Sequence, residues 1–320
     1  MLSESKIIGF LKNQFPEQIG DDAAILPLSK HKSYVISKDI LIEDIHFRFK
    51  YHQACHLAHK ALQVNISDIA AMGATPQYVL LGLAIPDHGK IYIDQFLENF
   101  SAICKASSII LIGGDTTKSP DKLFISITII GLIANAHIKF RNRAEDGNLI
   151  CIAGNLCDAH IGLTALERNI AGFDLYKEHF LMPNALLKEG LWFGKQRDVT
   201  AMMDISDGLF IDLKRLCAAS QVGAKVDIDK LKFSDKFKLA CEILKLDPMV
   251  TQLTGGEDYG LLLTIKPEAY SRIASKFKAR FGYQLKAIGQ ITKGSEVHFI
   301  QNDQLKTFNL QAFSHFGESL

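Results

Sequence analysis

The sequence predicts a protein of mixed α and β class that folds into two domains. The chain has 320 residues, and a single hydrophobic core seldom grows to that length, so we expect two cores. Short apolar runs typical of strands alternate with longer stretches in which apolar residues recur at helical spacing. A polar stretch at 139–148 interrupts this pattern. We therefore predict domains at 1–138 and 139–320.

In the first half, three segments have apolar residues at helical spacing, and we predict helices at 2–15, 52–72 and 91–107. The second of these ends at Gly73 and Pro76, which disfavour its continuation. Runs of β-branched and aromatic residues predict strands. These strands are expected at 33–37, meeting a cluster of carboxylates at Asp39, at 78–85, at 109–112, buried and closed by Gly113-Gly114, and at 123–134.

The second half also contains apolar residues at helical spacing and short strand-like runs, in a different order. Helices are predicted at 158–168, 185–192, 209–220 and 267–281, and strands at 149–153, 225–228, 259–265, 285–291 and 296–300. Neither half contains an internal repeat or a low-complexity tract.

Composition excludes several classes of function. Lys and Arg number 36 against 35 Asp and Glu, and they are scattered, so nucleic acid is not an expected partner. The longest apolar stretch, 123–134, is shorter than the ~18 to 20 residues that span a membrane. The N-terminus is polar from Ser3 to Lys6 and does not resemble a secretory signal. Six cysteines without a C-x-x-C pair suit a reducing compartment, and we expect a cytoplasmic protein.

Carboxylates recur where the apolar runs stop. A carboxylate beside a hydrophobic strand is costly to desolvate unless it is paired or binds a cation. Hard oxygen ligands from separate loops suit Mg²⁺ bridged to phosphate, and adjacent glycines let backbone N–H groups approach phosphate oxygens. These segments are Gly20-Asp21-Asp22, Ser37-Lys38-Asp39, Asn65-Ile66-Ser67-Asp68, Gly113-Gly114-Asp115-Thr116-Thr117, Asp204-Ile205-Ser206-Asp207-Gly208 and Gly255-Gly256-Glu257-Asp258-Tyr259.

Each segment taken singly also fits a helix cap or an Asx turn; Asp207, for example, could cap the helix that follows it. The repetition favours a site that binds metal and phosphate together. The chain has neither a G-x-x-x-x-G-K-[ST] loop nor the H-R-D and D-F-G motifs of protein kinases, so a different ATP framework is expected.

The ordered set of motifs resembles the thiamine-monophosphate kinase family. The motifs occur in the order and spacing of that family from residue 20 to residue 260, and weaker similarity reaches Phe313. They are Gly20-Asp21-Asp22-Ala23-Ala24, His46-Phe47, the segment 64–74 around Asn65-Ile66-Ser67-Asp68, Ile112-Gly113-Gly114-Asp115-Thr116-Thr117, Asp204-Ile205-Ser206-Asp207-Gly208-Leu209 and Gly255-Gly256-Glu257-Asp258-Tyr259.

This resemblance implies the two-domain fold of aminoimidazole ribonucleotide synthetase, with an N-terminal α/β domain and a C-terminal α+β domain. The sheet of the first domain would join that of a second subunit in a homodimer, and ATP would bind in the cleft between the domains. The implied reaction is the Mg²⁺-dependent, direct in-line transfer of the γ-phosphate of ATP to thiamine monophosphate, which gives thiamine diphosphate and ADP.

The resemblance also implies roles for individual residues. Asp204, Asp207 and Asp115 would be catalytic, and His46, Glu257 and Phe313 would hold the thiamine end of the substrate. Gly114, Asp115, Arg141 and Ser206 would contact ATP. The implied Mg²⁺ ligands are Asp22, Ser37, Lys38, Asp39, Asp68, Asp115, Asp204 and Asp207. From the residues alone, Arg141 fits a bidentate phosphate contact or a solvated linker charge equally well, and Phe313 fits ring stacking or packing of the tail.

Two departures from the family pattern motivate alternatives. Lys38 stands where the family often has Thr, which leaves the number of metal ions open, and the Arg-Pro-x-Pro-Arg pattern is reduced to the segment 182–186. An ATP-binding sensor without turnover, which would bind ATP and form no product, is therefore one alternative. Another synthetase of the same fold is a second, and a structural oligomer that binds neither ATP nor Mg²⁺ is a third.

Overall fold

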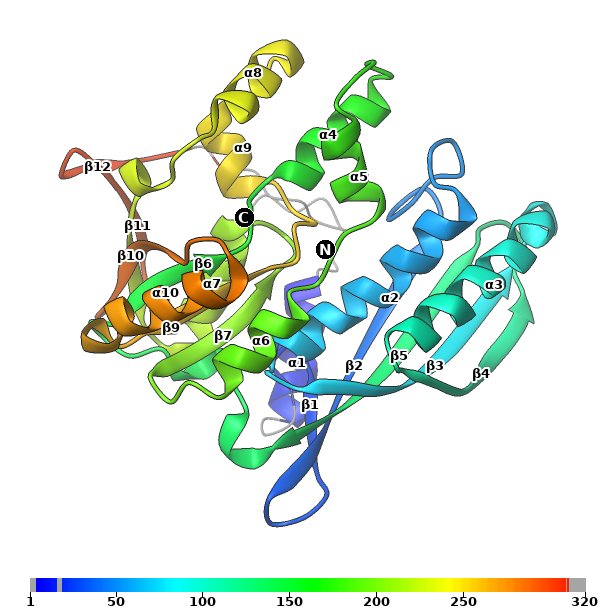
Figure 1. Ribbon diagram of the computed structural model, residues 1–320, viewed down its shortest axis with the longest axis horizontal. Coiled ribbons are helices and arrows are strands. Elements are labelled where there is room, and N and C mark those ends of the chain that lie inside the picture. Colours follow the sequence, from blue (N-terminus) through cyan, green and yellow to red (C-terminus); the bar gives the residue numbers. More distant parts are fainter. Residues whose placement is uncertain (1–3, 16–18, 309, 311–320) are drawn as a thin grey trace.

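Two β-sheets, each with its own helices, form the body of the molecule (Figure 1). The computed structural model describes residues 4–15, 19–308 and 310. The first sheet contains strands from residues 24–134 and the second contains strands from residues 149–306. The mixed α and β class is confirmed. The two sheets lie on either side of the predicted domain boundary, whose position stays a prediction.

The first sheet has five strands in the order β1-β2-β5-β3-β4. All neighbours are antiparallel except β3 and β4, which are parallel and leave β4 at one edge. The strands are β1 (Ala24–Pro27), β2 (Lys32–Ile42), β3 (Thr75–Ile85), β4 (Ile110–Lys118) and β5 (Phe124–Ala134).

Helices α2 (Ala54–Ala71) and α3 (Lys90–Ala106) lie on one face of this sheet (Figure 1). Alternate residues of β5, Ile125, Ile127 and Ile129, point into the core beneath them, as the two-residue period of a strand requires. The residues between them stay part-exposed on the opposite face. The sheet therefore has one packed face and one that is open in this chain.

The second sheet has seven strands in the order β12-β11-β8-β10-β6-β9-β7, with one parallel pair, β11 and β8. Strands β6 and β9 within it are almost entirely buried because both faces of the sheet are covered there. The strands are β6 (Leu149–Ala153), β7 (Val199–Ile205), β8 (Gly223–Asp227), β9 (Gly260–Ile265), β10 (Lys286–Thr292), β11 (Val297–Gln301) and β12 (Gln304–Lys306).

Two separate clusters of buried side chains cover the faces of the second sheet. Alternate residues of β6 divide between them, with Ile150 and Ile152 in one cluster and Cys151 and Ala153 in the other. The first cluster includes α4 (Asp158–Glu167), α7 (Leu209–Ser220) and α8 (Asp235–Leu244), and the second includes α6 (Leu187–Gly194) and α10 (Pro267–Phe281). The remaining helices are α5 (Asp174–Leu181) and α9 (Pro248–Thr254).

Helix α2 is the element at which the two halves meet. Ala71 at its end packs in the core cluster of α6 and α10. The segment before α6 follows α2: the His59 ring lies 2.8 Å from the carbonyl of Pro183, and the Ala185 amide donates to Gln63. The altered segment 182–186 thus joins the second half of the chain to α2.

The predicted helices and most of the predicted strands are confirmed, with small shifts at their ends. Two expectations were wrong. Strand β2 continues through Asp39, where a loop was expected, and β4 runs through Gly113-Gly114 as an exposed edge strand instead of a short buried one. The sequence patterns did not predict α5, α8, α9, β1, β7 and β12.

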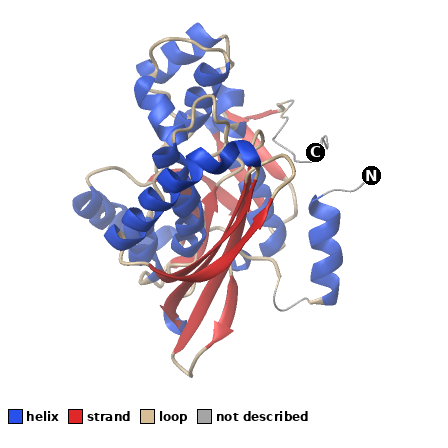
Figure 2. Ribbon diagram, turned by 90° about the vertical axis from the view of Figure 1, so that its right-hand side faces the viewer, coloured by secondary structure: helices blue, strands red, loops and turns tan. Residues whose placement is uncertain are grey.

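Helix α1 (Glu4–Gln14) stands apart from the sheets (Figure 2). Its apolar residues Ile7, Phe10 and Leu11 are exposed in this single chain. No helix among the described residues is long and apolar enough to cross a membrane.

Candidate active site

Three carboxylates from three different elements meet between the two sheets. Asp22 lies in the loop before β1, Asp68 on α2, and Asp204 near the end of β7. One oxygen atom from each lies within 4.8 Å of the others. Asp68 and Asp204 are 136 residues apart in the sequence, so only the packing of α2 against β7 brings them together.

Hydroxyl groups and one guanidinium hold these carboxylates in place. Ser37 on β2 donates to Asp68, and Ser67 donates to Asp204 at 2.7 Å. The Arg141 guanidinium donates to Asp22 from a largely buried position, so Arg141 is part of the cluster and not a solvated linker charge. The Oδ2 atom of Asp22 and the Nε atom of Arg141 are buried without a hydrogen-bond partner among the described residues.

Asp39 and Asp207 extend the cluster. Burial and, after it, the charge of Asp207 raise the pKa of Asp39. Burial and, after it, the charge of Asp39 raise the pKa of Asp68, so the three carboxylates are close enough to interact. Asp207 also receives a hydrogen bond from Arg215 on α7. The buried Asp212 carboxylate accepts from the backbone N–H groups of Ser206 and Asp207 at 3.1 Å each, which fixes the loop that carries both residues.

Burial and mutual repulsion destabilise the ionised form of the clustered carboxylates. Burial, together with the neighbouring carboxylates, raises the pKa of Asp68 and of Asp204 well above the usual value for aspartate. Burial also raises the pKa of Asp22, although Arg141 opposes this effect. The pKa of Asp39 rises to about 6 through burial and the charge of Asp207. Such a set of groups favours either protonation or a bound cation.

The residues fit Mg²⁺. Carboxylate and hydroxyl oxygens are the hard ligands that this ion prefers. Such oxygens lie within 4.8 Å of one another on Asp22, Asp68 and Asp204. The Oδ2 atom of Asp22 accepts no hydrogen bond from the described residues. The described part of the chain offers no histidine or cysteine to this group, as a zinc site would require.

These pKa shifts predict how the stability of the metal-free protein depends on pH. A carboxyl group whose pKa is raised on folding stabilises the folded state at low pH, and this contribution is lost as the pH rises through the folded pKa, here about 6 for Asp39. In EDTA, the melting temperature is therefore expected to fall by several degrees between pH 5 and pH 7.5. Asp68→Asn should reduce this fall, and the exposed Asp115→Asn should leave it unchanged. An equal fall in all three proteins would contradict the prediction.

Glu257 and His46 form a second group, joined by Lys60 of α2. The Lys60 ammonium donates to the Glu257 carboxylate at 2.5 Å and to the backbone carbonyl of His46 at 3.2 Å. Lys60 lies two helical turns before Asp68 on α2, which is roughly 12 Å along the axis. The two residues predicted to hold the organic end of the substrate are thus placed together around Lys60.

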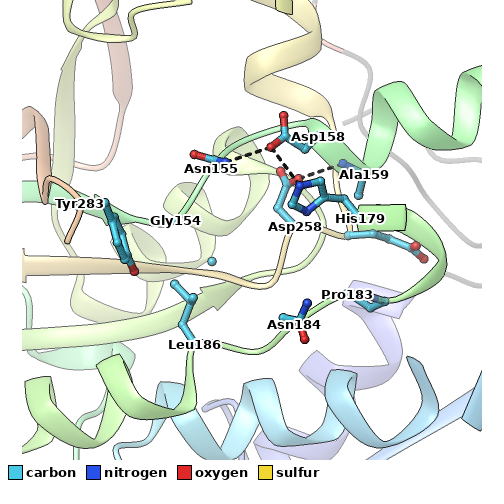
Figure 3. Close-up of a pocket in the computed structure, with 12 residues that line it drawn as sticks. Gly154, Asn155, Asp158, Ala159, His179, Pro183, Asn184, Leu186, Asp258 and Tyr283 are labelled. Atoms are coloured by element: carbon cyan, nitrogen blue, oxygen red, sulfur yellow. Dashed lines mark hydrogen bonds and ion pairs between the residues drawn. The ribbon is translucent and has the colours of Figure 1, made fainter. Parts of the chain in front are cut away.

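A cavity of about 400 Å³ adjoins Glu257 (Figure 3). Its described lining residues include none of the five clustered aspartates, and it extends between the α4–α5 region and the segment before α6. Asp158 lies in its wall next to His179 and accepts a hydrogen bond from Asn155 at 3.0 Å. Burial raises the pKa of Asp158, and His179 lowers it. The cavity therefore carries acidic groups within a mixed polar and apolar wall.

Three predicted site residues lie away from the cluster in this chain. Asp115 and Gly114 are on the edge strand β4. The pairing of β4, β3, β5 and β2 aligns Asp115 with Ile40, the neighbour of Asp39, across three strand spacings. These spacings separate the two residues by roughly 14 Å across the sheet. The Lys38 side chain points to the opposite face from Asp39 and donates to Ser126. Only its backbone can face the cluster. Phe313 lies outside the described residues.

The packing of the sheet requires glycine at position 114, which the sequence did not show. A Cβ atom at this position would lie 1.8 Å from the carbonyl oxygen of Leu81 on β3. The close approach of a neighbouring strand therefore requires glycine here, whether or not phosphate approaches as well.

Three residues of these two groups were not predicted from the sequence: Lys60, Asp212 and Ser67. A signal was present for the first two, because each is a charged residue within the buried stripe of its helix. Lys60 lies between the buried Leu57 and Ala61, and Asp212 lies between the buried Leu209 and Leu213. A charged residue on such a stripe needs buried partners.

Known proteins resemble this chain over most of its length. Two models of AIR synthase related proteins match the chain, the N-terminal domain at residues 20–133 and the C-terminal domain at residues 145–301. Thiamine-monophosphate kinase of Buchnera aphidicola subsp. Schizaphis graminum is 33% identical over 314 residues, which cover 95% of this chain and 94% of that protein. The enzyme of that name from Escherichia coli (strain K12) is 33% identical over 93% of this chain and 91% of its own length.

Solved structures of this family also superimpose on nearly the whole chain. The structure of AaThiL complexed with AMPPCP and TMP superimposes with a TM-score of 0.84 at 27% identity and covers 98% of this chain and 97% of that chain. Thiamine monophosphate kinase from Aquifex aeolicus superimposes with a TM-score of 0.79 at 26% identity, over 94% of this chain and 97% of that chain. The fold predicted from the motifs is confirmed. The chain belongs to the thiamine-monophosphate kinase family, among the AIR synthase related proteins.

Proposed function

We propose that this protein transfers the γ-phosphate of ATP to thiamine monophosphate, giving thiamine diphosphate and ADP. The names of its relatives and the AMPPCP and TMP complex of one of them support this reaction. The observation that carries the proposal is the buried carboxylate cluster around Asp22, Asp68 and Asp204, with Arg141 beside it. This combination suits the binding of polyphosphate through cations.

The acceptor phosphate is already ionised at neutral pH, so the enzyme needs no general base. Its task is to align donor and acceptor in line and to neutralise the charge on the transferred group. Asp22, Asp39, Asp68, Asp204 and Asp207 would hold Mg²⁺, which supplies that neutralisation when it is bound. Arg141, whose Nε atom has no hydrogen-bond partner among the described residues, would donate to a phosphate oxygen of ATP, and Ser206 would contact ATP as well.

The organic end of the acceptor would lie toward Glu257 and His46. Lys60, which joins these two residues, lies roughly 12 Å from Asp68 along α2, which leaves room for a phosphate at the cluster and a ring system at the other end. The Glu257 carboxylate would face the positively charged thiazolium ring. We propose Phe313 as a further contact with the ring system.

The direct experiment is to incubate the purified protein with ATP, thiamine monophosphate and Mg²⁺, and to measure thiamine diphosphate and ADP. Parallel samples contain EDTA or replace the acceptor by thiamine. Equal amounts of both products, lost in EDTA, are expected. ATP binding without either product would favour the sensor, whereas ADP formed without thiamine diphosphate would favour another synthetase of this fold.

A homodimer is part of the proposal. Ile110 and Ile112 are exposed on the edge strand β4, and Ile40 is half-exposed on the open face of the same sheet. A second copy of the chain would cover this edge and face, and it is also the means by which Asp115 would approach a carboxylate cluster. The six cysteines form no disulfide, which supports a cytoplasmic location.

The dimer predicts a measurable change in mass. Light scattering of the wild-type protein at micromolar concentration should give twice the mass of the chain, and Ile110→Lys should give the mass of one chain, because a lysine at a sheet edge prevents strand pairing. Lys50→Ile, at an exposed position outside this sheet, is the control and should stay dimeric. A wild-type protein that is monomeric under these conditions would contradict the prediction.

A further inference from the structure

Lys60 is a fully buried cation at the junction of the two halves. Its side chain is 0% exposed, and its ammonium has partners from three elements. These are the carbonyl of His46 in the segment after β2, the carboxylate of Glu257 in the loop before β9, and the ring of Phe180 on α5, whose centroid lies 4.1 Å away. Lys60 and its partner Glu257 are 197 residues apart in the sequence, so this contact depends on the tertiary structure.

The loop that carries Glu257 also shows signs of enforced geometry. Glu257 and Tyr259 both have positive φ angles, of 64° and 50°, which cost free energy for residues with a side chain. The surrounding structure compensates: the Glu257 amide donates to the carbonyl of Ser206 at 2.7 Å, and the Tyr259 amide donates to that of Ile205 at 2.9 Å. The half-buried Asp258 carboxylate accepts from the Cys157 amide. The backbone at Glu257 is therefore fixed, and Lys60 fixes its side chain.

Stability alone does not explain this lysine. A buried ion pair contributes little net stability, because the loss of hydration offsets the attraction, and an apolar pair of similar volume is often as stable. Glu257 stays 28% exposed and lines the cavity in Figure 3, so the pair is accessible from one side. Its geometry suits a carboxylate that is held in a defined direction for a ligand.

We infer that Lys60 is a positioning residue for the acceptor: its ammonium holds the Glu257 carboxylate and the His46 segment so that they receive the cationic organic end of the phosphoryl acceptor. This inference rests on the proposed function. The charges of Lys60 and Glu257 cancel, so the pair offers the acceptor a fixed hydrogen-bond and charge geometry and little net charge.

The inference predicts a selective loss of acceptor binding. Lys60→Met is expected to raise the KM for thiamine monophosphate about tenfold to a hundredfold, because truncating one partner of a buried charge pair releases the other. The KM for ATP should change less than about twofold, since the carboxylate cluster lies two helical turns away. Glu257→Gln should have a similar effect, and the double variant should add little to either single one, because both remove the same contact.

Lys139→Met is a matched control. Lys139 is also a buried lysine, and its ammonium donates to the carbonyls of Gln196 and Val199 at 2.8 Å each, away from Glu257. It should lower the melting temperature without a selective change in the KM for the acceptor. Lys60→Gln, which keeps a hydrogen-bond donor and loses the charge, replaces Lys60→Met if that variant does not fold.

Each outcome separates the alternatives. Equal changes in the KM for ATP and for the acceptor, or additive effects in the double variant, would show that Lys60 only supports the fold. A lower KM for the acceptor would also overturn the inference, because it would mean that the ammonium acts only by repelling the cation. Absence of thiamine diphosphate with the wild-type protein would instead refute the proposed function.

Discussion

Asp204→Asn is expected to lower kcat for thiamine diphosphate formation by about a hundredfold to a thousandfold, the usual effect of removing one group that stabilises the charge of a transition state. Asp204 is 3% exposed, and its carboxylate lies with those of Asp22 and Asp68. Asparagine has the same shape, and its carbonyl oxygen still accepts the hydrogen bond of Ser67. The substitution therefore removes one negative charge from the proposed Mg²⁺ site with little change in packing.

The same variant should be more stable than the wild-type protein in EDTA. Burial and the charge of Asp22 raise the pKa of Asp204 well above its usual value, so the ionised carboxylate destabilises the metal-free folded state at neutral pH. Asparagine removes this cost, and the melting temperature should rise. A loss of activity together with a gain in stability distinguishes a functional role from simple unfolding.

Asp198→Asn is the control, because Asp198 lies just before the same strand and pairs with Arg272 on the surface. It should leave kcat within about twofold of the wild-type value, as a surface pair contributes little. The measurement is kcat over a range of Mg²⁺ concentrations. If Asp204→Asn keeps wild-type kcat at saturating Mg²⁺, the carboxylate cluster is not the centre of phosphoryl transfer.

Gly190→Ala is expected to destabilise the protein by about 2 to 3 kcal/mol, the upper part of the range for overpacking in a close-packed interior. A Cβ atom on Gly190 of α6 would lie 2.2 Å from the carbonyl oxygen of Ala70 on α2. The backbones of the two helices must separate to admit it. Because Ala70 is two residues from Asp68, the displacement should also disturb the carboxylate cluster and reduce kcat.

Urea unfolding and kcat, measured on the same preparation, test this prediction. Gly9→Ala is the control: a Cβ atom there would meet nothing within 4 Å, and alanine favours a helix over glycine by up to about 1 kcal/mol. It should leave stability equal or slightly higher, with unchanged kcat. An unfolding free energy for Gly190→Ala equal to that of the wild-type protein would show that α2 and α6 are not held as closely as the structure has them.

Local sequence patterns predicted the helices and strands well where the buried residues recur at the period of the element. Helix α2 and strand β5 have apolar residues at clear periods of 3.6 and 2, and both were found within two residues of their ends. The edge strand β4 shows where this fails. Its isoleucines predicted a buried strand, yet they are exposed in this chain, because burial depends on what covers a strand and not on its own residues alone.

The sequence by itself determined the mixed α and β class, the order of the motifs and the type of chemistry, because carboxylates beside apolar strands need a cation and the ordered motifs are specific to one family. Only the tertiary structure decided which carboxylates meet. It joined Asp22, Asp68 and Asp204, and it separated Asp115 and the Lys38 side chain from them. It also revealed Lys60, because strand register, helix packing and the partners of a buried charge arise from contacts between residues that are far apart in the chain.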